Sequence, residues 1–133
     1  MRQGFKKVGF LSSWILPILL IGGVSLGGLY IGSIHLFVFL VIPLMDYWVS
    51  LDKENVPKEA VSEVARDQFY RLTTFAWVFV QVGVLLWACW QVATLDFSWW
   101  EYVLLVSGTA LVTGGVGITV AHELGHKSGR WER

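Results

Sequence analysis

Residues 8–45 decide the fold; they read VGFLSSWILPILLIGGVSLGGLYIGSIHLFVFLVIPLM and contain no Asp, Glu, Lys or Arg. This stretch is about twice as long as the roughly 20 apolar residues that one helix needs to cross a bilayer. We therefore predict a hairpin of two membrane-spanning helices, over residues 10–28 and 34–49, with a tight connection at residues 28–33. The glycines in this stretch favour a turn and close helix packing.

Two further segments are long and free of formal charge. Residues 72–95 and residues 102–121 are each long enough for one more span. The short polar sequence at residues 96–98 predicts a turn between them. Trp99, Trp100 and Tyr102 follow that turn, as is typical of an aromatic belt at the level of the lipid headgroups.

The basic residues indicate how the chain is oriented. All 10 Lys and Arg lie before residue 8, within residues 50–71, or after residue 126. Residues 50–71 also carry apolar side chains at helical spacing, which predicts an amphipathic segment along the membrane surface. Under the positive-inside rule, this loop and both termini are expected in the cytoplasm. The sequence thus predicts an all-α polytopic membrane protein with four spans.

The composition excludes several other classes of protein. The chain is 55% hydrophobic and only 15% charged, whereas a soluble domain carries about 25% charged residues. The net charge of +0 argues against nucleic-acid binding. Cys89 is the single cysteine, so no disulfide can form within the chain.

The last apolar segment ends in the sequence His122-Glu123-Leu124-Gly125-His126. Histidines four residues apart lie on one face of a helix, so both imidazoles can reach one metal ion. Ionisable groups at a membrane boundary are costly unless they have partners. His122 and His126 are therefore candidate metal ligands, although imidazoles bind Zn, Fe, Cu and Ni alike. His35 is expected to be an interfacial or packing residue, remote from this pair.

Several functions share this motif. In zinc proteases HExxH supplies two ligands, and its Glu acts as a general base on metal-bound water. An intramembrane zinc protease is therefore one alternative, although Lys127 and the residues after it end the apolar segment. A non-catalytic membrane scaffold is another alternative.

Three stretches, taken in their order along the chain, carry a more specific resemblance. They are residues 43–55, which include Asp46 and Asp52; residues 66–71, which read RDQFYR; and residues 119–127, which read TVAHELGHK. Together they resemble the N-terminal part of the alkane 1-monooxygenases, within the membrane fatty-acid desaturase and hydroxylase superfamily. The third stretch resembles the first histidine box of that family.

The resemblance implies a non-haem centre of two iron ions at the cytoplasmic face of the bacterial inner membrane. Such an enzyme uses O₂ to hydroxylate the terminal carbon of an alkane, with electrons from rubredoxin and its reductase. A related hydroxylase or desaturase that acts on another apolar substrate is the alternative. The second and third histidine boxes are absent, so residues 1–133 are expected to be a truncated N-terminal portion without activity of its own.

The resemblance also implies roles for individual residues. His122 and His126 are the implied iron ligands. Glu123, Asp46 and Asp52 are candidate acceptors for the second ring N–H of the iron-bound imidazoles, a group that usually has such a partner. For the two aspartates, capping of a helix end and pairing with basic residues are equally good explanations. The sequence indicates no further catalytic residue.

Overall fold

A computed structural model of the chain describes residues 12–49, 68–119 and 122. These residues contain no strand, so the all-α prediction is confirmed for them. The helices are η1 (Ser12–Trp14), α2 (Ile15–Leu26), η2 (Gly28–Gly32), α3 (Ser33–Leu36), η3 (Phe37–Val41), α4 (Ile42–Val49), α6 (Gln68–Thr94), α7 (Trp99–Ala110) and η4 (Leu111–Val116). Segments η1 and η2 are 3₁₀ helices, and η3 and η4 are π-helical.

Three helical stretches in the described part of the chain are long and apolar enough to cross a membrane. They are Gly28–Met45, Leu72–Thr94 and Trp99–Thr119. The last three predicted spans therefore have counterparts, although the second and fourth begin earlier than predicted. The first predicted span contains α2, a shorter apolar helix of 12 residues. Four full spans are thus not confirmed.

The turn of the first hairpin lies earlier than predicted. The sequence placed the connection at residues 28–33, but the chain reverses at Gly27 and Gly28, whose φ angles are 72° and 57°. Glycine adopts such left-handed angles without the steric cost that a Cβ would bring. Helical structure resumes at Gly28, so the predicted start of the second span at residue 34 is wrong.

The two arms of this hairpin lie close together directly before and after the turn. A Cβ built at Gly23 would overlap the backbone carbonyl oxygen of Tyr30. The Ser33 hydroxyl donates a hydrogen bond of 3.1 Å to the carbonyl oxygen of Leu19, across the hairpin. The position of the turn is therefore fixed by a close backbone approach that only glycine permits at residue 23.

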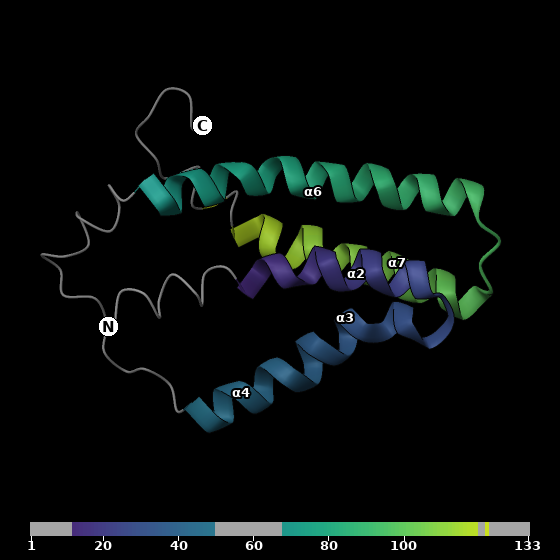
Figure 1. The fold of residues 1–133 in the computed structure, drawn as a ribbon, viewed down its shortest axis with the longest axis horizontal. Helices are drawn as coiled ribbons and strands as arrows, with labels where there is room; N and C mark the ends of the chain where they lie inside the picture. Colours follow the sequence, from purple (N-terminus) through teal and green to yellow (C-terminus); the bar gives the residue numbers. More distant parts are fainter. Residues whose placement is uncertain (1–11, 50–67, 120–121, 123–133) are drawn as a thin grey trace, which may run out of the picture.

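The helices run side by side, and the two turns between them lie at the same end of the molecule (Figure 1). The α2–η2 and α6–α7 turns lie at one end, and the end of α4, the start of α6 and the end of η4 lie at the other. Segment α7 contacts α2, η2 and α6, whereas α4 diverges from the bundle. The fully buried side chains are Leu20, Ile31, Ile34, Trp77, Leu105 and Val112.

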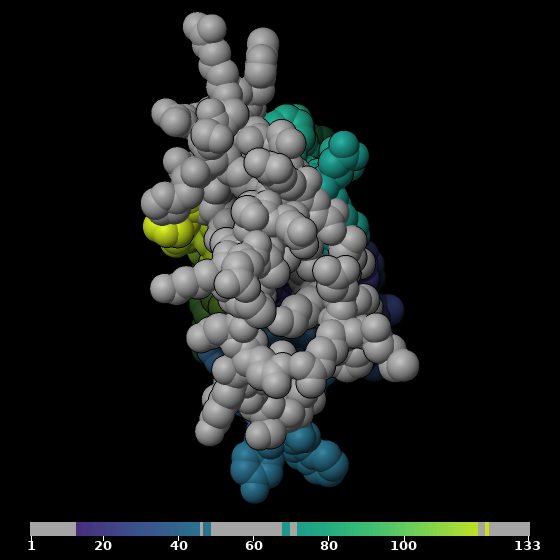
Figure 2. All heavy atoms as spheres, turned by 90° about the vertical axis from the view of Figure 1, so that its left-hand side faces the viewer, coloured from purple at the N-terminus to yellow at the C-terminus, as the bar shows by residue number. Residues whose placement is uncertain are grey.

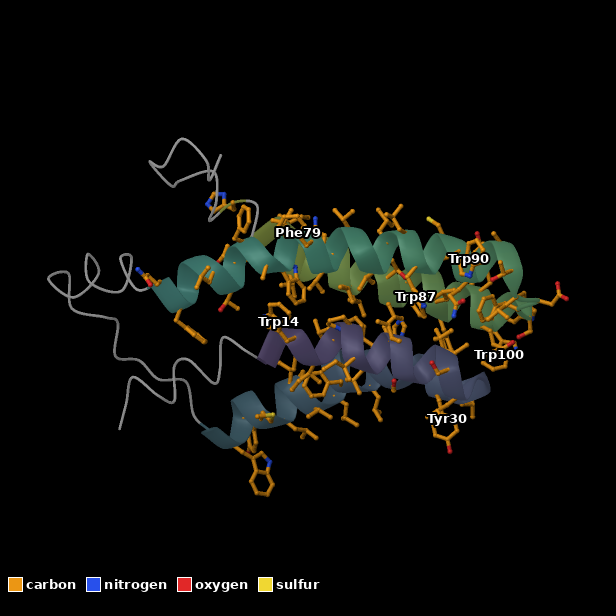
Figure 3. The ribbon with its side chains drawn as sticks, turned by 45° about the horizontal axis from the view of Figure 1, so that its top comes forward. Trp14, Tyr30, Phe79, Trp87, Trp90 and Trp100 are labelled. Atoms are coloured by element: carbon orange, nitrogen blue, oxygen red, sulfur yellow. The ribbon has the colours of Figure 1, made fainter. Side chains whose placement is uncertain are left out.

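Aromatic side chains occupy both the interior and the turn end. Trp14 points from the start of the α2 arm toward α6 (Figure 3), where its ring meets Trp77 edge-on at 5.6 Å between centroids. Trp90, Trp100 and Tyr30 lie near the two turns (Figure 3). Amphipathic rings at one end of apolar helices are typical of the headgroup level.

A carboxylate joins the two turns. The turn at residues 96–98 is confirmed, and α7 begins directly after it at Trp99. Glu101 accepts hydrogen bonds from the Ser98 N–H at 3.0 Å and the Ser98 hydroxyl at 2.6 Å. Its other oxygen accepts the Gly28 N–H at 3.0 Å. The Ser-x-x-Glu spacing is the sequence signature of a capping box, but the bond to Gly28 depends on tertiary structure.

We expect Gly23→Ala to lower the free energy of unfolding in detergent micelles by about 1–3 kcal/mol, because the new methyl group displaces the Tyr30 backbone. Gly22→Ala is the matched control, since a Cβ there meets nothing within 4 Å. Its effect should stay within about 0.5 kcal/mol. SDS titration of both variants measures the difference, and equal stabilities would contradict the close approach at Gly23.

Candidate metal centre

His122 lies just beyond the helix that comprises α7, η4 and residues 117–119. It is helical and exposed. The other implied ligand, His126, lies outside the described residues, as do Glu123 and Asp52. Asp46 lies on α4, but its side chain is likewise outside the description. Of the five candidate site residues, the structure therefore describes the side chain of His122 alone.

His122 lies at the end of the molecule opposite the turns. Figure 2 views the molecule from this end: the start of α6, the end of α4 and the last described residues reach the surface at separate places. Within the described ranges, no three His, Cys, Asp or Glu residues lie close enough to hold a metal ion together. Imidazole chemistry fits iron as well as zinc, but His122 alone is too few ligands for a complete site.

His35 belongs to a helix contact and not to this end of the molecule. Its Nε2 lies 2.8 Å from the hydroxyl oxygen of Ser107 on α7. The Ser107 hydroxyl hydrogen is directed at the Val103 carbonyl oxygen, at 2.6 Å. Nε2 must then carry the proton and donate to Ser107. Along the helix, Ser107 precedes His122 by roughly 22 Å, so His35 cannot share a metal ion with His122.

An apolar groove lies between α6 and the α7–η4 helix. Its volume is about 410 Å³, and its lining residues are Leu85, Ala88, Cys89, Val92, Tyr102, Leu105, Val106, Thr109, Ala110 and Thr113. The groove ends at Thr113, roughly 14 Å along the helix axis before His122. It can accept an apolar chain but does not reach the candidate ligand.

The three helices that are long and apolar enough to cross a membrane indicate a helical integral membrane protein. An alkane 1-monooxygenase of Pseudomonas putida is 31% identical over 106 residues, which are 80% of this chain and 26% of that protein. Alkane 1-monooxygenase 2 of Pseudomonas aeruginosa is 35% identical over 99 residues, covering 72% of this chain and 26% of that protein. Alkane 1-monooxygenase 2 of Alcanivorax borkumensis is 27% identical over 135 aligned residues, which cover 96% of this chain and 35% of that protein.

The chain is therefore related to the alkane 1-monooxygenases, and the resemblance found in its sequence is confirmed. It spans about a quarter of the length of the first of these relatives. No protein-family model and no solved structure matches the chain.

The sequence did not indicate Ser107 as the partner of His35. We expect a double-mutant cycle of His35→Ala and Ser107→Ala to give a coupling energy of about 0.6 kcal/mol and at most about 1.7 kcal/mol, as for other hydrogen bonds between membrane helices. SDS unfolding of the two single variants and the double variant measures it. Additive effects of the two substitutions would show that the bond does not hold α3 against α7.

Proposed function

We propose that this chain forms part of an integral-membrane monooxygenase with a centre of two non-haem iron ions that hydroxylates the terminal carbon of alkanes. One observation carries the proposal: the similarity to alkane 1-monooxygenases over about four fifths of the chain. Two structural findings support it. The described helices are apolar, and His122 is exposed just beyond the last of them.

In this proposal, His122 and His126 bind iron through one ring nitrogen each. Glu123, Asp46 and Asp52 accept the N–H groups of iron-bound imidazoles, which fixes the tautomer and orientation of each ring. The iron, when bound, supplies the oxidising chemistry with O₂, and rubredoxin with its reductase supplies the electrons.

The location of the site follows from the solubility of the reactants. An alkane dissolves in the bilayer and reaches the protein between apolar helices, for which the groove between α6 and α7 is a candidate path. A soluble electron donor needs the metal close to an aqueous face. The segregation of basic residues favours the cytoplasmic face of the inner membrane.

The chain has 3 histidines, of which His35 is committed to Ser107. A centre of two metal ions needs more imidazoles than His122 and His126 provide. We therefore propose that this chain does not hydroxylate alkanes alone and that the remaining ligands come from further histidine boxes.

A chimaera tests the proposal: this chain replaces the matching segment of the Pseudomonas putida alkane 1-monooxygenase. We expect the chimaera to retain iron and to hydroxylate octane. His122→Ala and His126→Ala should each lower both readouts by about 100-fold or more, because loss of a group that merely orients a ligand already costs about 10–100-fold. Metal analysis of purified protein and product quantification measure these effects.

His35→Ala is the control, since it removes an imidazole from the same segment without touching the proposed site. It should leave the iron content unchanged. Zinc in place of iron, with peptide cleavage, would favour the protease. Full activity of the His122→Ala chimaera would contradict the role of His122 as a metal ligand. The hypothesis of a non-catalytic membrane scaffold would then remain.

A further inference from the structure

The helix that leads to His122 is interrupted by the π-helical segment η4 (Leu111–Val116). A π-helical turn closes its hydrogen bonds from residue i to i+5, so it takes up one residue more than an α-helical turn. Such turns often occur at functional sites. Everything after η4 is therefore rotated relative to a continuous α-helix.

The spacing of buried positions shows this rotation. On the α7 side, Gly108, Thr109 and Val112 are buried at the three- and four-residue spacing of an α-helix. The next buried position is Gly117, five residues after Val112. A Cβ at Gly117 would overlap the side-chain amide of Gln81 on α6. One continuous face therefore packs against the neighbouring helices before and after η4, because the π-helical turn absorbs the extra residue.

The rotation decides where His122 points. An α-helix turns about 100° per residue. In a continuous α-helix, His122 would lie roughly 90° from the buried face of α7, and Gly117 roughly 130° from it. With one residue absorbed, Gly117 lies roughly 30° from that face. Regular α-helical spacing from Gly117 would then put His122 roughly 170° from the face, on the opposite side. The observed burial of Gly117 agrees with the second arrangement.

We propose that η4 is a positioning segment that turns the histidine box away from α2 and α6, both of which η4 contacts. This inference rests on the proposed function, in which His122 and His126 bind iron. His126 lies outside the described residues, and its spacing from His122 is the one at which two histidines share a face of a helix. The remaining imidazoles must then approach from the side of this helix opposite α2 and α6.

Single-residue changes in η4 test this role in the chimaera described above. Deletion of Gly114 removes the extra residue, so η4 becomes α-helical and His122 keeps its direction. Insertion of one alanine after Gly114 adds a residue that the turn cannot absorb and rotates His122 by about 100°. We expect iron content within about twofold for the deletion and a loss of about tenfold or more for the insertion.

A disulfide readout reports the rotation without any metal. In a Cys89→Ala background, Gln81→Cys with Gly117→Cys should cross-link in the parent and in the deletion variant, but not in the insertion variant. Gln81→Cys with Val116→Cys is the matched control pair, which a continuous α-helix would favour.

The outcomes separate the two proposals. Cross-linking of the 81–116 pair in place of the 81–117 pair would overturn the inference alone. Equal loss of iron in both variants, with the disulfide pattern as expected, would also overturn it. Absence of iron from every variant and from the parent chimaera would overturn the proposed function, and the role of η4 with it.

Discussion

The hydrocarbon core of a bilayer offers no water to backbone N–H and C=O groups, so a chain that crosses it must satisfy them internally. In this chain the first reversal lies at Gly27 and Gly28, which have left-handed φ angles. The Glu101 carboxylate accepts the Gly28 N–H there. Because Glu101 also holds Ser98, one side chain ties the two hairpin turns together. The link joins η2 to the start of α7, two segments that also pack against each other.

The sequence predicted what charge and length control. The helical class, the turn at residues 96–98 and the helix over 72–95 follow from runs without charge and from the polar residues between them. The position of the first turn did not follow, because five glycines between residues 22 and 32 all permit one. The close approach of Gly23 to Tyr30 selects Gly27 and Gly28, and that contact exists only in the folded hairpin. The π-helical turn of η4 was equally hidden, since an apolar membrane helix has no polar face to reveal a change of period.

The sequence predicted the kind of residues in the candidate site, but their location in the fold only in part. Spacing alone predicts His122 and His126 as a ligand pair, and this role stays a prediction. The sequence also kept His35 apart from them, as its bond to Ser107 bears out. It could not show the contact between Gly117 and the Gln81 side chain, from which we infer the direction of His122. The roles of Asp46, Asp52 and Glu123 stay predictions.

Site-directed labelling of the membrane-embedded chain tests our proposal that the histidine pair opens to the cytoplasm while both turns lie on the other side. Single cysteines at His122, Ser98 and the exposed Leu29, in a Cys89→Ala background, are treated in intact cells with a maleimide that does not cross the membrane. We expect positions 98 and 29 to react, whereas position 122 reacts only after the cells are opened. Labelling of position 122 in intact cells, with protection of position 98, would contradict it.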